Sequence, residues 1–370
     1  MDKKLVIFGT RPEFIKLYPL VEEVNLRGIR KDYLFLFTGQ HQELMLDLFD
    51  LLDFTPDLQL PVKKHENSLS YSFAYLLHSL QEKVDQLKKE FTLTLILAQG
   101  DTTTSACASL CAFFNQIPFA HIEAGLRTGN LNSPFPEEYF RKLISLSTTL
   151  HFALTPIAKS NLIAESVPEK NIVITGNTGV DALRILGSKL DTSEALKNQN
   201  TDSKNTILIT CHHRENQNKH YEDLMQSVIQ LTREYPHFNF IWLSHKSPFI
   251  ENTLKEFAVN KLSNLSIKPA MSIVEMIAVY KRSLLILTDS GGIQEEAVSF
   301  NIPVLVLRSC TERIESVDLG YSLLCENLQE DLIEKFKILI DRNRQDMHNP
   351  YGDGFAAKRI VDYLLQHGLN

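Results

Sequence analysis

The stretch LTLILAQGDTTTSACASLCAFFNQIPFAHIEAG, residues 93–125, holds the pattern that decides the fold. The apolar run 93–99 predicts a buried strand, the segment 102–116 predicts a helix, and the run 117–122 predicts a second strand. This strand–helix–strand order is typical of parallel β/α units. Ligands bind beyond the carboxyl ends of strands in open α/β sheets, so the polar residues after each run are the candidates for function.

The same rhythm continues along the chain in two series. The first half adds the strand-like runs KLVIFGT, DYLFLFT, LHFAL and NIVITGNTG, and the second half has TILIT, FNFIWLS, LSIKPA, LLILTDS and IPVLVLRS. A polar segment, residues 187–206, contains the end of a helix and a linker between the two series. We therefore expect the α/β class, with two Rossmann-like doubly wound domains, residues 1–180 and 181–352, and a cleft between them.

Composition narrows the functional classes. The chain has 370 residues, enough for two domains, and a formal net charge of −7, which disfavours a nucleic-acid partner. No apolar run approaches the ~18 residues of a membrane span, and the first run is too short for a signal peptide, so we expect a cytoplasmic protein without membrane contact. The five cysteines form no CxxC pair, which favours buried thiols over disulfides.

The first half places cations and acids after its strands. Arg11 opens a helix, with Pro12 suited to its first position, and Lys16 follows about one turn later; together they suit a phosphate or carboxylate. Taken alone, Asp101 is best explained as a helix N-cap. Glu123 and Glu137 follow the next strand. These acids either form a charge cluster with nearby arginines, which predicts ion pairs and no pocket, or they transfer protons.

The second half offers groups for an anion. His212 and His213 follow a strand; a zinc site is disfavoured because adjacent histidines point in different directions and no third ligand is suitably spaced. The segment 290–292, Ser-Gly-Gly, at a helix start suits a diphosphate, and its alternative is a tight turn. Glu296, one turn along, is placed to accept hydrogen bonds from ribose hydroxyls. No GxGxxG or P-loop motif occurs in the chain, which disfavours dinucleotide redox chemistry and phosphoryl transfer.

Taken in order, the motifs resemble one family over nearly the whole chain. They are FGTRPEFIK, GDTTT, HIEAGLRTG with PEE, GNT, HHREN, TDSGGIQEEA, TERIES and NPYGDG. This set is similar to that of the non-hydrolysing UDP-N-acetylglucosamine 2-epimerases. The resemblance implies GT-B architecture, a homodimer, a C-terminal helix within residues 353–370 that packs back on the first domain, and a role in cell-surface polysaccharide biosynthesis. It implies no cofactor and no metal.

The resemblance also implies roles for individual residues. The catalytic set is Asp101, Glu123, Glu137, His212, Arg11 and Lys16. The substrate-binding set is Thr10, Arg141, His245, Met276, Ser290, Gly291, Gly292, Glu296 and Arg313. Residues at a possible allosteric site for a second UDP-GlcNAc are Gln40, His41 and His213.

The chemistry limits the possible mechanisms. C2 of the sugar has no acidic proton, so inversion requires transient oxidation by a nicotinamide or elimination across C1–C2. Without a dinucleotide fingerprint, elimination is left: a carboxylate removes the C2 proton, UDP departs to leave a 2-acetamidoglucal, and UDP then adds back. Which acid serves which face of C2 stays open.

Three positions depart from the family pattern. His213 replaces an arginine that helps to hold the activating ligand, Glu275 or Met276 stands where many members have Phe, and Ile314 stands where Pro is usual. The alternatives are an epimerase of another UDP-2-acetamido sugar, a hydrolysing 2-epimerase, a GT-B glycosyltransferase and a nucleotide-sugar sensor.

Overall fold

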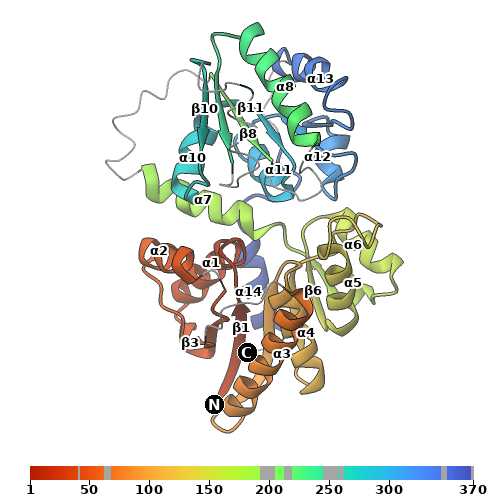
Figure 1. Cartoon of the computed structure of the whole chain (residues 1–370). Coiled ribbons are helices and arrows are strands. Elements are labelled where there is room, and N and C mark those ends of the chain that lie inside the picture. Colours follow the sequence, from red (N-terminus) through yellow and green to blue (C-terminus); the bar gives the residue numbers. More distant parts are fainter. Residues whose placement is uncertain are drawn as a thin grey trace. The chain divides into compact units, whose positions relative to one another are not determined.

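The computed structural model describes eight stretches of the chain and divides into two compact units. The described stretches are residues 1–40, 42–61, 68–191, 205–211, 219–244, 257, 262–342 and 348–367. Unit 1 contains Met1–Ala182 and Tyr351–Asn370, and unit 2 contains Leu183–Pro350. Each unit has one parallel sheet flanked by helices, so the expected α/β fold class is confirmed (Figure 1).

Unit 1 is built on a seven-stranded sheet in the order β3-β2-β1-β4-β5-β6-β7, and its strands pair in parallel. The strands are β1 (Asp2–Phe8), β2 (Tyr33–Phe37), β3 (Leu58–Gln59), β4 (Thr92–Gln99), β5 (Phe119–Ala124), β6 (Leu150–Ala153) and β7 (Ile172–Ile174). Strand β3 was missed by the sequence analysis, because two residues are too few to show a periodic pattern. The order places β1, β4 and β5 side by side at the centre.

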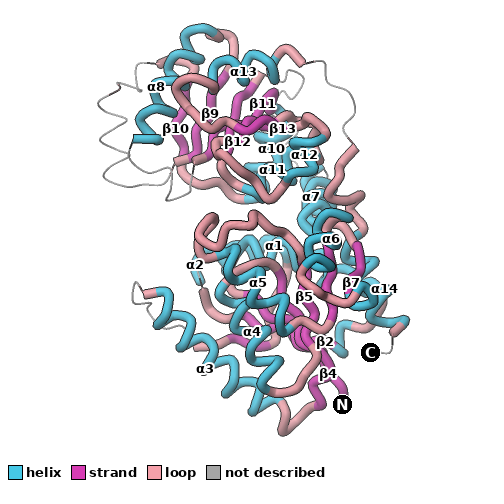
Figure 2. Tube along the Cα trace, turned by 90° about the vertical axis from the view of Figure 1, so that its right-hand side faces the viewer, coloured by secondary structure: helices cyan, strands magenta, loops and turns pink. Residues whose placement is uncertain are grey.

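Helices cover both faces of this sheet (Figure 2). They are α1 (Arg11–Leu26), α2 (Gln42–Leu52), α3 (Leu69–Leu87), α4 (Thr103–Phe114), α5 (Glu137–Ser147), α6 (Pro156–Ala164) and α14 (Ala356–Gln366). Helix α7 (Thr178–Asp191) begins in unit 1 and continues into unit 2. One apolar cluster joins α3, α4 and α5 to the sheet. A second, aromatic cluster joins α1 and α2 to it through Phe14 and Phe49, which pack with their ring centroids 5.1 Å apart.

The C-terminal helix α14 packs against α1 in unit 1. Its first amides, on Ala356 and Ala357, donate to the two carboxylate oxygens of buried Asp181 at 3.0 and 2.8 Å. A carboxylate at a helix N-terminus satisfies amides that have no partner within the helix and interacts favourably with the helix dipole. Arg27 adds an ion pair to Asp362 at 2.7 Å.

Unit 2 has a six-stranded parallel sheet in the order β10-β9-β8-β11-β12-β13. Its strands are β8 (Thr206–Thr210), β9 (Asn239–Leu243), β10 (Leu265–Lys268), β11 (Ser283–Thr288), β12 (Val304–Val306) and β13 (Ser322–Leu324). Its helices are α8 (Lys219–Glu234), α10 (Ile273–Arg282), α11 (Gly291–Val298), α12 (Ile314–Asp318) and α13 (Leu332–Ile340). One cluster packs α8 and α13 on one face, and another packs α10 and α11 on the other. No helix in the described part of the chain is long and apolar enough to cross a membrane.

Candidate active site

The central strands of unit 1 carry the predicted acids and cations at their carboxyl ends. Arg11 follows β1, Asp101 follows β4, and Glu123 is the penultimate residue of β5. Since β1, β4 and β5 are neighbours in a parallel sheet, their carboxyl ends lie along one edge. Arg11 and Asp101 are half-buried, whereas the side chain of Glu123 is only 7% exposed.

Glu123 has an unusual backbone. Its φ is +70°, a left-handed conformation that is rare for a residue other than glycine, and the pairing of β5 with β6 shifts between Ile122 and Ala124. Such a bulge re-aims a side chain, and backbone strain of this kind is often found at functional sites. The carboxylate of Glu123 accepts hydrogen bonds from Lys16 Nζ at 2.5 Å and from Gln99 Nε2 at 2.6 Å. The structure therefore joins Lys16 and Glu123, which are 107 residues apart in the sequence.

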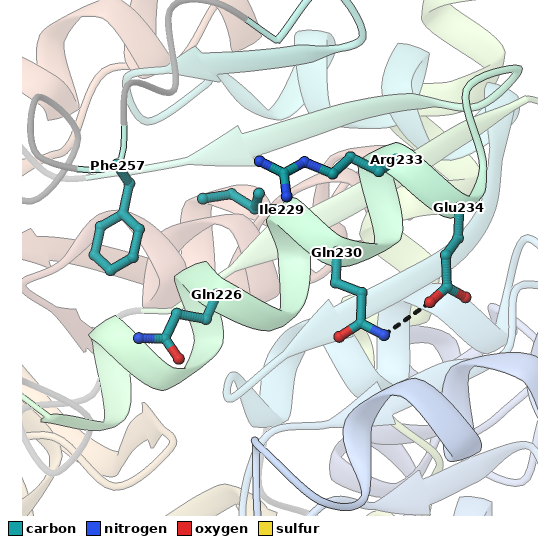
Figure 3. A pocket seen from close by; sticks show the side chains of 6 residues that line it. All are labelled: Gln226, Ile229, Gln230, Arg233, Glu234 and Phe257. Carbon is teal, nitrogen blue, oxygen red and sulfur yellow. Dashed lines mark hydrogen bonds between the residues drawn. The ribbon is translucent and has the colours of Figure 1, made fainter.

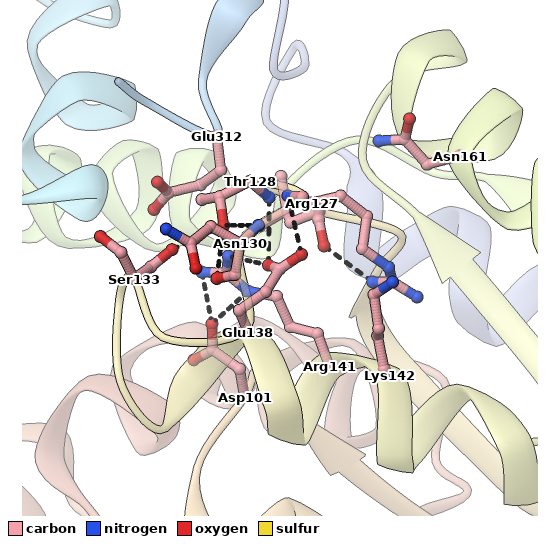
Figure 4. A network of polar contacts seen from close by, with 12 residues as sticks. Asp101, Arg127, Thr128, Asn130, Ser133, Glu138, Arg141, Lys142, Asn161 and Glu312 are labelled. Carbon is pink, nitrogen blue, oxygen red and sulfur yellow. Dashed lines mark hydrogen bonds and ion pairs between the residues drawn. The ribbon is translucent and has the colours of Figure 1, made fainter. Parts of the chain in front are cut away.

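Asp101 is not the N-cap of α4, so that interpretation is wrong. The cap is Thr102, whose hydroxyl accepts the amide of Ser105 at 3.1 Å. Instead, Asp101 Oδ2 accepts hydrogen bonds from Nε and Nη2 of Arg141, both at 2.7 Å (Figure 4). Arg141 also donates through Nη1 to Glu138 at 3.0 Å. The ion pairs that a charge cluster predicts are therefore present at Asp101.

Arg141 and Glu138 form a buried support for Asp101. Glu138 is fully buried, and its carboxylate also accepts the amides of Thr128 at 3.0 Å and Gly129 at 3.1 Å. The loop before α5 is thus fastened to the same network as Asp101 (Figure 4). Arg127, the other arginine expected near the acids, binds Glu165 at 2.6 Å instead.

Glu137 is the first residue of α5 and is half-buried. Backbone amides at the N-terminus of a helix favour the ionised form of a carboxyl group. Glu137 can therefore act as a base from this position.

Glu13 was missed by the sequence analysis. Its carboxylate is only 2 % exposed and accepts the amides of Gly9 at 2.5 Å and Thr10 at 3.2 Å. Burial raises the pKa of Glu13 to about 6, although the hydrogen bonds from Thr102, Gly9 and Thr10 act in the opposite direction. Glu13 therefore ties the turn that carries Arg11 to the turn that carries Asp101. The signal was present in the sequence as a capping-box pattern, Thr10-x-x-Glu13.

In unit 2, the Ser290-Gly291-Gly292 turn forms the N-terminus of α11. The hydroxyl of Ser290 accepts the amide of Ile293 at 3.5 Å. A Cβ atom on Gly291 would lie 2.6 Å from Glu312 Oε1, so only glycine fits there without a shift. Backbone amides at a helix N-terminus suit an anion, and a diphosphate at this turn stays a prediction.

Buried and half-buried side chains surround this turn. Arg313 is 4 % exposed and binds Glu295 and Glu312, each at 2.7 Å. Glu296, also on α11, is half-buried and accepts a hydrogen bond from Tyr280 at 2.6 Å.

The positions 275, 276 and 314, which depart from the family pattern, lie in or at the start of helices α10 and α12. Met276 packs against the apolar cluster of α10 and α11, whereas Glu275 forms a capping box with Ser272 at the start of α10. Ile314 is the first residue of α12, a position that also accepts Pro.

Four predicted residues lie outside the described part of the chain: His41, His212, His213 and His245. Gln40 is described and lies beside the β1–α1 turn, because a Cβ atom on Gly9 would be 3.2 Å from its Cδ. Thr10 is the N-cap of α1. Within the described ranges, no three His, Cys, Asp or Glu side chains are grouped so that they could hold a metal ion.

A surface hollow in unit 2 contains none of the predicted residues. It is lined by the α8 side chains Gln226, Ile229, Gln230, Arg233 and Glu234 together with Phe257 (Figure 3). Two of these, Gln230 and Glu234, hydrogen-bond each other at 2.7 Å. The lining of this hollow therefore shares no residue with the turn at Ser290.

Comparison with known proteins gives a consistent result. Residues 27–365 match the family model described as UDP-N-acetylglucosamine 2-epimerase. A UDP-N-acetylglucosamine 2-epimerase of Neisseria meningitidis is 36% identical over 99% of this chain and 100% of its own length.

Solved structures are similar over the whole chain as well. The Neisseria meningitidis UDP-GlcNAc 2-epimerase bound to UDP-GlcNAc has a TM-score of 0.86 at 35% identity, covering 98% of this chain and 100% of that one. The Methanocaldococcus jannaschii UDP-GlcNAc 2-epimerase in complex with UDP-GlcNAc and UDP has a TM-score of 0.83 at 30% identity, covering 99% and 100%.

Proposed function

The chain belongs to the UDP-N-acetylglucosamine 2-epimerase family, and from this premise we propose that it interconverts UDP-GlcNAc and UDP-ManNAc without net hydrolysis. The observation that carries the proposal is the strained strand end at Glu123, held by Lys16 and Gln99. We assign the sugar chemistry to unit 1 and the binding of UDP to the Ser290 turn of unit 2. Both relatives described above were solved with UDP-GlcNAc, which supports this substrate.

The proposed reaction is an anti elimination followed by re-addition. A carboxylate removes the proton from C2 as the C1–O bond to UDP breaks, and the electron pair of the C2–H bond forms the C1=C2 bond of a 2-acetamidoglucal. The diphosphate oxygen then adds back to C1 while a carboxylic acid delivers a proton to the opposite face of C2. Two acids are therefore needed, from the set Asp101, Glu123 and Glu137.

The cations serve the departing diphosphate. Arg11, at the start of α1, is positioned with its turn by Glu13, and we assign it and His212 to the negative charge that develops on UDP. Holding UDP in place keeps the return step effectively unimolecular, so that the glycal is not released. We further propose a cytoplasmic homodimer; size-exclusion chromatography with light scattering tests the dimer.

One assay tests the reaction. UDP-GlcNAc incubated with the protein in heavy water and followed by proton NMR should give an equilibrium mixture with UDP-ManNAc and deuterium at C2 of the product. Free ManNAc with UDP would indicate hydrolysis, epimerisation without deuterium would exclude the elimination, and no change would leave a glycosyltransferase or a sensor.

A matched pair of variants tests the role of the acids. Glu137→Gln should abolish turnover while UDP binding stays within about twofold, because the amide cannot accept the C2 proton. Glu165→Gln, at the end of α6 and paired with Arg127, should retain wild-type turnover. Full activity of Glu137→Gln would remove this residue from the mechanism.

A further inference from the structure

A buried histidine that the proposed reaction does not use lies beside the turn that carries Asp101. His121 is on β5, which pairs in parallel with β4, and it is only 1 % exposed. Its Nε2 atom lies 2.8 Å from the carbonyl oxygen of Gly100, the residue before Asp101. Because a carbonyl oxygen can only accept a hydrogen bond, the imidazole donates through Nε2–H. The contact therefore fixes the tautomer of His121 as well as the place of the carbonyl group.

This contact acts on the backbone of Asp101. Gly100 has a φ of +79°, a left-handed conformation, and its amide donates to the carbonyl oxygen of Ile122 at 3.0 Å. The carbonyl group of Gly100 and the Cα atom of Asp101 belong to one planar peptide unit. A donor that fixes this oxygen therefore fixes the plane from which the side chain of Asp101 departs. Arg141 binds the carboxylate, so Asp101 is restrained at its backbone and at its acid group.

The two neighbouring strands hold each other's acids through neutral donors. Gln99, the last residue of β4, donates to the Glu123 carboxylate on β5 at 2.6 Å. His121, two residues earlier on β5, donates to the peptide before Asp101. Both donors are buried, where a hydrogen bond is electrostatically stronger than it is in water. The two bonds thus brace the candidate acids of β4 and β5 against each other.

Burial keeps His121 neutral. It lowers the pKa of the imidazole to about 4, and the positive charge of Arg127 acts in the same direction. The hydrogen bond to Gly100 and the charges of Asp101 and Glu123 act against this shift. Among the residues that the structure describes, buried Nδ1 has no hydrogen-bond partner, so a second proton there would be an unsatisfied donor. His121 is therefore a fixed donor and not a proton carrier.

We propose that His121 is a positioning residue for the epimerisation: as a neutral Nε2–H donor to the carbonyl oxygen of Gly100, it sets the position of the Asp101 carboxylate at the reacting sugar. The inference rests on the proposed function and commits Asp101 to one of the two acid roles. It assigns no contact with the substrate to His121, because the side chain is buried.

The test compares His121→Leu with His121→Gln. Leucine fills the space with an apolar side chain and removes the donor, whereas the amide of glutamine can place an N–H group close to the position of Nε2. We expect kcat for UDP-GlcNAc to fall about 30- to 100-fold in His121→Leu, as for a misplaced catalytic group, with KM and the Kd for UDP within about twofold. His121→Gln retains a donor, so its kcat should stay within about fivefold of wild type.

The matched control is His151→Leu. His151 is equally buried and pairs in register with His121, but it lies on β6, one strand further from β4. Its substitution also removes a buried imidazole from the sheet, so it should lower the midpoint of urea unfolding much as His121→Leu does. Its kcat should stay within about twofold of wild type, because the turn at Asp101 is not displaced.

A spectroscopic measurement reads the tautomer without using activity. Long-range proton–nitrogen correlation spectra of protein with isotope-labelled histidine distinguish the two neutral tautomers and the imidazolium, and the His121 signal is the one missing from His121→Gln. We expect an Nε2–H imidazole that stays neutral from about pH 8 down to about pH 5.5. An Nδ1–H tautomer, or protonation within this range, would overturn the inference.

Three kinetic results would also overturn it. Unchanged kcat in His121→Leu, or equal losses in His121→Leu and His121→Gln, would mean that the donor does not matter. Equal losses in His121→Leu and His151→Leu would mean general loosening of the sheet. If His121→Leu does not fold, His121→Asn replaces it, since its shorter amide does not reach Gly100, and wild-type kcat in that variant rejects the proposal. Absence of epimerisation by the wild-type protein would instead reject the proposed function, and this inference with it.

Discussion

Glu13→Gln offers the sharpest test of how the β1–α1 turn is held, because the expected effect depends on pH. The pKa of Glu13 is raised to about 6 from its ordinary value of 4.5 by burial. A carboxyl group with a raised pKa binds its proton more tightly in the native state than in the unfolded state. The contribution of Glu13 to the free energy of unfolding should therefore fall as the pH rises from 4.5 to 6. Above pH 6 this contribution should stay at its reduced value.

The size of this effect follows from the shift. A shift of one unit corresponds to about 1.4 kcal/mol, so the shift of Glu13 corresponds to about 2 kcal/mol. Glutamine does not ionise, so the Glu13→Gln variant should lack this fall. The difference in unfolding free energy, variant minus wild type, should therefore rise by about 2 kcal/mol between pH 4.5 and pH 7. Altered hydrogen bonds in the variant add an offset that is the same at each pH.

Urea unfolding across this pH range measures the difference. The single tryptophan of the chain, Trp242, lies in the core of unit 2, so its fluorescence does not follow unit 1. Far-UV circular dichroism, to which the helices of both units contribute, is used instead. Ser79→Ala, a buried substitution in unit 1 without a carboxyl group, is the control and should displace the wild-type curve without changing its slope. Parallel curves for wild type and Glu13→Gln would refute the reasoning.

Three further predictions concern the support of the site. Arg141→Met should destabilise unit 1 by about 3–5 kcal/mol in urea unfolding because it leaves buried Glu138 without its cation. Adding Glu138→Gln should recover part of this loss. If the losses of the two single variants simply add in the double variant, the pairing is contradicted. Gly291→Ala should weaken UDP binding at least tenfold in calorimetry, since its Cβ would lie 2.6 Å from a carboxylate oxygen. The control Gly187→Ala in α7, where no atom lies within 4 Å of the added Cβ, should leave the free energy of unfolding unchanged or raise it by about 0.5–1 kcal/mol. Similar UDP affinity in both variants would argue against a tight turn. Lys16→Met should lower kcat by at least about 100-fold with a smaller change in KM. The reason is that the Glu123 carboxylate, 2.5 Å from the ammonium group of Lys16, loses a donor that orients it. A change in KM alone would assign Lys16 to binding.

The sequence predicted the repeating β/α units well, because long apolar strands and amphipathic helices have distinct periods. It missed β3, whose two residues are too few to show a period, and β13, a strand of three residues. It also favoured Asp101 as a helix cap when that residue was considered alone. The cap is the next residue, Thr102, and a local pattern cannot separate two adjacent capping residues.

The sequence alone determined the order of the β/α repeats along the chain and the positions of the polar residues that follow the strands. Both features depend on neighbouring residues in the sequence. Only the tertiary structure decided which of those residues act on one another. The Lys16–Glu123 pair and the Asp101–Arg141 pair join residues 107 and 40 positions apart. The physical reason is that such contacts arise from the order of strands in the sheet, and from the bulge that turns Glu123, neither of which has a local signature in the chain.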